Sequence, residues 1–180
     1  MTYTRTPIGS ATPFVLASVK AHMRVDAFDD DTAIQGMASA AAIEIEGYCD
    51  LALITQTITT TTDAWPGQAI ALPVGPVAPD TVATVSVVEA DGTTTTVTDG
   101  FWLEGGRYPV LRFTTTPGAR LRIVYAAGYG ATAAAIPADL SLAIMDQALR
   151  YYDRRGDDDA PQGLAISAAR IAARYRRVKA

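Results

Sequence analysis

The spacing of apolar residues changes twice along this chain of 180 residues. In residues 31–48 and again in residues 138–153, apolar side chains recur every three or four positions, which is typical of helices with one buried face. Between these segments, residues 54–126 contain short runs rich in Thr, Val and Ile, separated by turn-forming pairs such as Asp91-Gly92. The sequence therefore predicts an α+β fold in which an antiparallel β-lobe is inserted between helices.

Two further segments complete a helical core of about four helices. Residues 16–24 carry Leu16, Val19 and Met23 on one face, and residues 164–178 form a last helix after a polar break. The expected divisions are N-terminal core helices in residues 1–52, the β-lobe in 53–127, a linker and third core helix in 128–159, and a protruding basic C-terminal helix in 160–180.

Charge is distributed unevenly between the body of the chain and its C-terminal end. Residues 160–180 contain five bases and no acid, so their formal charge of +5 leaves −9 for the rest of a chain whose total is −4. A negative net charge argues against a dedicated nucleic-acid-binding protein, because such proteins usually carry a basic surface. A basic arm on an acidic body indicates that the arm meets an acidic partner.

The predicted last helix carries two adjacent stripes, and together they are the predicted docking residues. The apolar stripe contains Leu164, Ala168, Ile171, Tyr175 and Val178, and the basic stripe contains Arg170, Arg174 and Arg177. A narrow apolar seam beside a cationic seam is typical of a helix laid into a groove of another protein. Two alternatives stay open, namely contact with DNA phosphates and a helix folded back on its own acidic body.

Residues with catalytic potential are few, and none has the partners that catalysis needs. His22 is the only histidine, and no Ser or Cys nucleophile signature accompanies it. Cys49 lies at the apolar end of a predicted helix, where a buried small hydrophobe is expected. As the single cysteine it cannot form an internal disulfide, which fits a reducing cytoplasm. We therefore expect no enzymatic activity.

Two aspartate triplets and one glycine motif invite a metal or cofactor interpretation. Residues 29–31 and 157–159 are consecutive aspartates, whereas calcium loops place their ligands at alternate positions around a glycine. Helix capping and solvated loops explain them better. Residues 128–133 match G-x-G-x-x-A, but Pro137 interrupts the helix that a dinucleotide site requires. No metal and no cofactor is expected.

Several short motifs follow one another along the chain, namely Leu16-Ala17-x-x-Lys20-x-His22-Met23-Arg24-Val25-Asp26, Asp29-Asp30-Asp31, Tyr48-Cys49-Asp50-Leu51-Ala52-Leu53-Ile54-Thr55-Gln56-Thr57, Trp65-Pro66, Leu72-Pro73, Pro76-Val77, Asp91-Gly92, Val124-Tyr125-x-Ala127-Gly128-Tyr129 and Ile136-Pro137-Ala138-x-Leu140. In this order and spacing, the motifs resemble the head–tail connector or adaptor proteins of tailed phages, which also occur in prophages and gene transfer agents. The resemblance spans nearly the whole chain, although Leu51-Ala52 replaces the usual Gly-Arg pair.

The resemblance implies a structural virion protein without catalysis. It implies a dodecameric ring beneath the portal that joins the portal to the tail, with DNA passing through the lumen. The partners it implies are the portal protein, neighbouring copies of the chain and a downstream head-closure or tail protein. In related connectors the C-terminal helix engages the portal, and residues 164–179 occupy that place here.

The chain has no stretch approaching about 18 uncharged apolar residues and no apolar run near its start. We therefore expect a soluble protein that is cytoplasmic during assembly and then lies at the head–tail neck of the particle. A competing hypothesis is a carbohydrate-binding β-module that uses Trp65, Trp102 and Tyr108. A DNA-contacting role of the basic C-terminal helix is the third.

Overall fold

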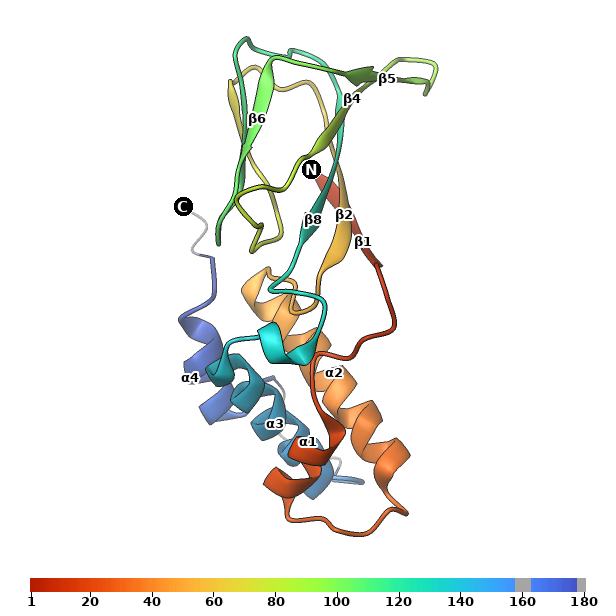
Figure 1. Ribbon diagram of the computed structural model, residues 1–180, viewed down its shortest axis with the longest axis vertical. Helices are drawn as coiled ribbons and strands as arrows, with labels where there is room; N and C mark the ends of the chain where they lie inside the picture. Colours follow the sequence, from red (N-terminus) through yellow and green to blue (C-terminus); the bar gives the residue numbers. More distant parts are fainter. Residues whose placement is uncertain (158–162, 178–180) are drawn as a thin grey trace. The chain divides into compact units, whose positions relative to one another are not determined.

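The computed structural model describes residues 1–157 and 163–177, and in these residues the chain forms two compact units (Figure 1). The β unit contains Met1–Ser10 and Thr55–Tyr129, and the helical unit contains Ala11–Ile54 and Gly130–Ala180. The chain therefore passes between the two units at residues 10–11, 54–55 and 129–130. The predicted α+β fold, a helical core with an antiparallel β-lobe, is confirmed.

The helical unit has four α-helices within its described residues, namely α1 (Leu16–Met23), α2 (Asp31–Cys49), α3 (Ala138–Asp153) and α4 (Ile166–Ala173), and a 3₁₀ turn at Ala133–Ala135. α3 packs against α1, α2 and α4 (Figure 1). Large aliphatic side chains of α2 and α3 meet at the centre and are fully buried: Ile34, Ile45, Leu140 and Ile144. No helix among the described residues is long and apolar enough to span a bilayer.

The aspartates at the start of α2 were expected to cap the helix, and the structure gives two of them different partners. Asp31 lies in the first turn, where its charge favours the positive end of the helix dipole, but its carboxylate accepts a bond from Lys20. Asp30 makes no side-chain cap and instead accepts a hydrogen bond from the Tyr152 hydroxyl of α3. These carboxylates therefore join α2 to α1 and α3.

The β unit contains two antiparallel sheets. The larger has five strands in the order β1 (Thr2–Pro7), β2 (Gln56–Thr62), β8 (Leu121–Ala127), β4 (Thr84–Val88) and β5 (Thr94–Val97). The smaller has three in the order β3 (Ala69–Ala71), β7 (Val110–Phe113) and β6 (Phe101–Glu104). The predicted turn at Asp91-Gly92 joins β4 to β5, with Gly92 at φ +86°, a conformation that glycine adopts without strain.

Alternating side chains of β2 and β8 build the core of the β unit. Ile58 of β2 lies opposite Tyr125 of β8, and both are buried. The Tyr125 hydroxyl accepts a hydrogen bond from the Val74 amide at 3.2 Å and donates one to the Val74 carbonyl at 3.1 Å. A buried tyrosine thus finds both of its hydrogen-bond partners on one loop residue and fixes that loop against the sheet.

Strand β1 departs from the expectation that residues 1–52 belong with the helices. Thr2–Pro7 pair with β2 along their whole length and lie at the edge of the larger sheet. Five of the six residues are exposed, so the alternation of apolar and polar residues that identifies a half-buried strand is missing. Pro7 ends the strand at an edge, where the missing amide costs no ladder bond.

Candidate functional site

The segment that leads into α4 is fastened to α3 by two hydrogen bonds. The Arg150 guanidinium donates to the Gly163 carbonyl at 3.0 Å. The Ala165 amide donates to the side-chain oxygen of Gln147 at 2.6 Å. Ala165 is the residue just before α4, so Gln147 satisfies an amide that the helix itself leaves without an acceptor.

Gln147 is fully buried and connects three helices. Its amide nitrogen donates to Glu44 of α2 at 2.8 Å, and the Tyr151 hydroxyl donates to the same carboxylate oxygen at 2.6 Å. Burial and then the neighbouring Glu44 carboxylate raise the pKa of Tyr151 above its ordinary value, so the phenol keeps its proton. The start of α4 is therefore tied through Gln147 to both long helices.

The inner face of α4 is made of alanines. Ala168 and Ala172 have no exposed surface, and the Cys49 thiol donates to the Ala172 carbonyl at 3.3 Å. Cys49 is itself buried, as its sequence position predicted. Small side chains let α4 approach α2 and α3 closely. The sequence predicted a protruding helix over residues 164–178, whereas α4 covers Ile166–Ala173 and packs against α3 and α2 of its own chain.

The residues after α4 bind the first turn of α3. The Tyr175 hydroxyl donates to one oxygen of Asp139 at 2.7 Å, and the Arg174 guanidinium donates to the other at 3.1 Å. The Arg176 guanidinium lies 5.2 Å from the ring centroid of Tyr48 of α2. Polar contacts at both ends and alanines between them therefore hold α4 in place.

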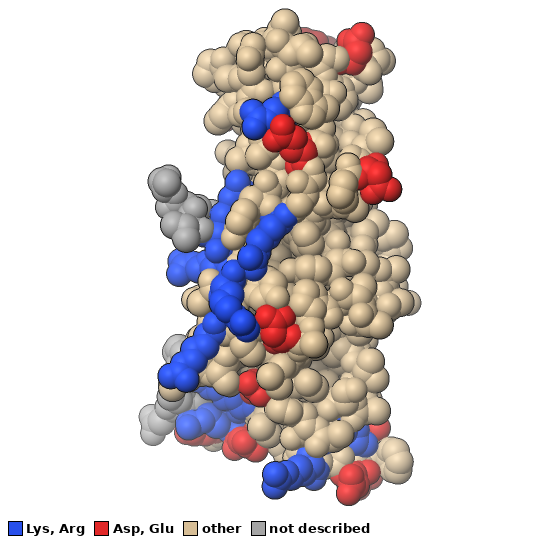
Figure 2. Space-filling model, turned by 60° about the vertical axis from the view of Figure 1, so that its left-hand side comes forward, with Lys and Arg blue, Asp and Glu red and all other residues tan. Residues whose placement is uncertain are grey.

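The outer face of α4 is exposed and basic, and it consists of Ile166, Arg170 and Arg174, spaced one helical turn apart. Ile166 is 74% exposed, and the Arg174 side chain is 63% exposed. Figure 2 shows Lys and Arg side chains gathered in a band over α4 and the residues that follow it. We call the two arginines of this outer face, Arg170 and Arg174, the basic face.

The structure divides the predicted docking residues between two sides of α4. Ala168 points inward and Tyr175 reaches Asp139, so the apolar stripe serves, in large part, the chain's own helical unit. Leu164, Ile171 and Arg177 are partly exposed, while Arg170 and Arg174 face outward. Val178 lies outside the described residues.

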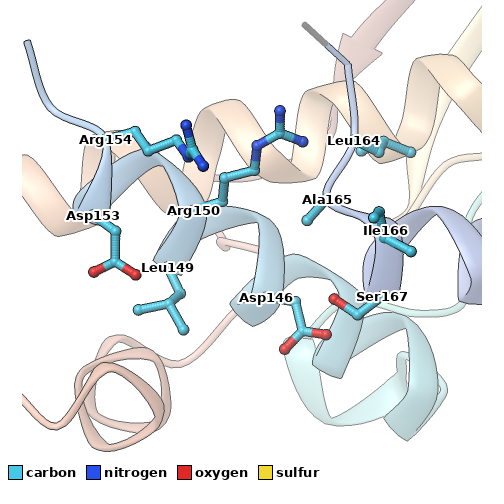
Figure 3. A pocket seen from close by; sticks show the side chains of 9 residues that line it. All are labelled: Asp146, Leu149, Arg150, Asp153, Arg154, Leu164, Ala165, Ile166 and Ser167. Carbon is cyan, nitrogen blue, oxygen red and sulfur yellow. The ribbon is translucent and has the colours of Figure 1, made fainter. Parts of the chain in front are cut away.

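A groove of about 570 Å³ lies between α3 and the segment entering α4 (Figure 3). Leu149, Leu164 and Ile166 supply its apolar lining. The guanidinium groups of Arg150 and Arg154 lie along one edge and the carboxylates of Asp146 and Asp153 along the other, as Figure 3 shows. We call this the α3–α4 groove.

Sequence reasoning missed both the groove and Ile166. Ile166 lies outside the spacing that defines the apolar stripe, and its exposed side chain is visible only once the helix is placed. Leu149 was assigned to the buried face of α3, but the structure leaves part of it open to the groove. The sequence offered one signal for the groove, namely that Leu149 and Leu164 lie on either side of the polar segment 154–163.

The remaining candidate residues have ordinary structural partners. His22 Nε2 lies 3.0 Å from a carboxylate oxygen of Asp146. Within residues 1–157 and 163–177, no three His, Cys, Asp or Glu side chains gather as a metal site. Trp102 and Tyr108 are 47% and 44% exposed, and the Trp65 indole donates to the Ala69 carbonyl at 3.0 Å.

Sequence comparison yields no relatives, whereas structural comparison does. No sequence-family model matches the chain. No curated protein matches it either. A chain from the neck of an empty gene transfer agent particle, computed with C6 symmetry, is 27% identical, with a TM-score of 0.81 and coverage of 98% of this chain and 97% of that one.

Two further solved structures give the same result. A chain of the virion of a native gene transfer agent particle is 26% identical, with a TM-score of 0.79, and a chain from the neck of the native particle, computed with C12 symmetry, is 26% identical, with a TM-score of 0.78. Each match covers 98% of this chain and 97% of the other. The resemblance to head–tail connector proteins is confirmed, and the similarity supports a structural component of a particle neck.

Proposed function

We propose that this protein is the adaptor of a phage-like or gene transfer agent particle, assembled as a ring that joins the portal to the tail. The observation that carries the proposal is the structural similarity to chains of particle necks over nearly the full length of both proteins. The chain would be made in the cytoplasm and become part of the neck, between the portal and a head-closure or tail protein.

The basic face of α4 is the part of the helical unit that we assign to portal docking. Arg170 is exposed, and within the described part of the chain it has no ion-pair partner. Arg174 shares Asp139 with Tyr175, but most of its side chain is open to solvent. An acidic surface on the portal would complement these two arginines.

A single basic face binds weakly, and a ring compensates for this. Exposed ion pairs typically contribute about 0–1 kcal/mol each, so a few arginines give one copy little affinity. Once one copy in a ring is docked, its neighbours bind at a high effective concentration, and the weak contacts act together. The proposed docking therefore depends on the assembled ring.

The acidic body of the chain suits the passage of DNA. Residues 1–159 carry a formal charge of −9, because the total of −4 includes +5 from the remaining residues. Like charges on a channel wall and on phosphates prevent a passing duplex from adhering. In this proposal, DNA contacts are transient and independent of sequence.

The neck location is tested by labelling the protein in purified particles and locating the label by electron microscopy. Label at the junction of head and tail is the expected result. Particles whose necks lack the chain would overturn the proposed function.

The docking role is tested by charge reversal, with Arg170→Glu compared with Arg122→Glu, an exposed arginine of β8. We expect the Arg170 variant to fold normally but to be lost from particles, because the introduced carboxylate repels an acidic portal surface. The Arg122 variant should enter particles at the level of the natural chain. Equal incorporation of both variants would contradict docking through α4.

Point substitutions are preferable to deletion of the C-terminal segment. Removing α4 would take the Ala165 amide from Gln147 and the Ala172 carbonyl from Cys49 and would expose the parts of α2 and α3 that α4 contacts, so loss of function would follow from damage to the fold. A charge reversal on the outer face leaves those contacts intact.

A further inference from the structure

We propose that, in the ring, the loop between α1 and α2 of one copy docks into the α3–α4 groove of the next copy, with Phe28 as the inserted side chain. This inference rests on the proposed function, because it concerns how neighbouring copies meet. It names the two surfaces and predicts which residues of one chain lie beside which residues of its neighbour.

The inserted residue is an aromatic side chain that the chain's own fold leaves open. Phe28 is 82% exposed, although aromatic side chains are enriched where proteins bury surface against a partner. Its ring centroid lies 4.5 Å from the Lys20 ammonium. The rest of the ring is free to enter a neighbouring surface.

The loop around Phe28 is held in a fixed conformation before any partner arrives. Lys20, which is almost buried, also binds Asp31, and the Asp31 amide donates to the Phe28 carbonyl at 3.1 Å. Asp30 is fixed by the Tyr152 hydroxyl at 2.9 Å and lies 3.4 Å from the Arg155 guanidinium. A side chain presented by a loop that is already ordered loses little entropy on docking.

The α3–α4 groove has the size and lining that an aromatic side chain requires. Its volume of about 570 Å³ falls within the range of roughly 300–1,000 Å³ found for sites that enclose small ligands. Leu149, Leu164 and the exposed Ile166 offer apolar contacts. Covering Ile166 and Phe28 against each other removes two of the most exposed apolar side chains of the helical unit from water.

Charges beside the two surfaces are arranged to match. Asp26, Asp29 and Arg24 are exposed around Phe28, and none of them has an ion-pair partner among the described residues. Of the charged groups that line the groove, Asp146 lies 3.0 Å from His22 and Arg150 donates to the Gly163 carbonyl, whereas Asp153 and Arg154 are exposed. A loop with charges of both signs can therefore pair with Arg154 on one edge and Asp153 on the other. Within its own chain, Arg154 has a local partner, Asp157 at 3.2 Å, an exposed pair that contributes little.

A second copy of this chain fits as the occupant, because the loop and the groove are two different surfaces of one helical unit whose apolar and charged groups complement each other. The loop precedes α2, whereas the groove lies between α3 and the start of α4. Contact between unlike surfaces of identical chains is head-to-tail, and head-to-tail contacts generate rings when the rotation closes. The related necks were computed with C6 and C12 symmetry, in agreement with a closed arrangement.

The test is a disulfide between copies, formed in purified particles. The chain carries Phe28→Cys and Ile166→Cys together, and Cys49 stays because it is buried. After mild oxidation, we expect a non-reducing gel to show a ladder of multimers in steps of about 19 kDa. Each single variant should stay monomeric, and a mixture of the two single variants should give dimers only.

The outcomes separate this inference from the proposed function. Normal incorporation into necks with only monomers on the gel would overturn the loop-in-groove contact and leave the adaptor role intact. Cross-links to a chain of another mass would also overturn it, because the groove would then hold a different partner. Absence of the natural chain from necks would instead reject the proposed function.

If the cysteine variants do not enter particles, a charge exchange tests the loop-in-groove contact instead. Asp29→Arg alone and Arg154→Asp alone should each lower incorporation about tenfold, because each places like charges together in every contact of the ring. The double variant should restore incorporation to near the natural level. Failure of the double variant to recover, with both single variants folded, would overturn the inference.

Discussion

The α2–α3 pair and the helix α4 lie in the same helical unit, yet different forces hold them there. α2 and α3 meet through large aliphatic side chains with no exposed surface, including Ile45 and Ile144. α4 contributes only the alanines Ala168 and Ala172 to the buried interior, and its ends are fixed by hydrogen bonds to Gln147 and to Asp139.

The magnitudes of the two kinds of contact differ accordingly. Burying one large aliphatic side chain contributes about 1.5–3 kcal/mol, whereas a typical hydrogen bond contributes about 0.5–1.5 kcal/mol net. Apolar burial therefore supplies most of the stability of the α2–α3 pair. Hydrogen bonds decide where α4 lies, so this helix is positioned with only a small gain in free energy.

The largest expected effect comes from the apolar interface, at Ile45. Ile45→Ala removes a fully buried side chain, and we expect the free energy of unfolding to fall by about 2–5 kcal/mol. The matched control is Ile43→Ala on the same helix, where the side chain is 69% exposed and the change should stay within about 0.5 kcal/mol. Urea unfolding measures both, and equal losses would contradict the stated division of forces.

A smaller effect is expected at the polar connection to α4. Gln147→Ala removes the acceptor of the Ala165 amide and one of the two hydrogen bonds to Glu44, and we expect a loss of about 1–3 kcal/mol. Amide hydrogen exchange should quicken in α4 more than in α2, because the bonds that position α4 are the ones removed. Gln35→Ala, at an exposed position of α2, is the control. An equal increase in the amide exchange rate of all helices would show that these hydrogen bonds do not specifically position α4.

The smallest effect concerns Asp30, whose carboxylate joins the start of α2 to Tyr152 and Arg155 at the end of α3. The hydrogen bond from Tyr152, and then that from Arg155, hold the pKa of Asp30 below its ordinary value of 3.8. Because the pKa is lowered in the folded state, this stabilisation is complete above about pH 4 and is lost as the pH falls through the lowered value.

Tyr152→Phe should move the pKa of Asp30 upward toward its ordinary value and flatten the dependence of stability on pH in the acid range. A carboxyl titration by NMR, with unfolding followed from pH 7 to pH 2.5, measures both quantities. The same acid dependence in the variant and the natural chain would show that Tyr152 does not control this carboxylate.

Sequence patterns predicted the long elements well, because each has an unambiguous period. The helix predicted to begin within residues 29–31 and to continue to about residue 48 corresponds to α2 at Asp31–Cys49, and the helix predicted over about 138–153 corresponds to α3 at Ala138–Asp153. The Asp91-Gly92 hairpin was also confirmed, because few residue pairs tolerate that turn. Strand β1 was missed because edge strands need no apolar face.

That the last helix docks on another protein stays a prediction, because periodicity alone cannot identify a partner. A stripe of apolar residues on the last helix indicates a buried face but does not say whether its own chain or another buries it. In the structure Ala168 is buried by its own chain, while Arg170 and Arg174 are exposed. The groove depends on Gln147 and Arg150 reaching residues 163–165, a tertiary contact that no local pattern reveals.

The interleaving of the two units has a mechanical consequence for a part of a particle neck. Residues 10–11, 54–55 and 129–130 each connect the β unit to the helical unit. Tension between the units is therefore divided among three covalent strands in parallel, and no single linker transmits the whole force. A force that pulled the two units apart would therefore act on all three connections before the units could separate.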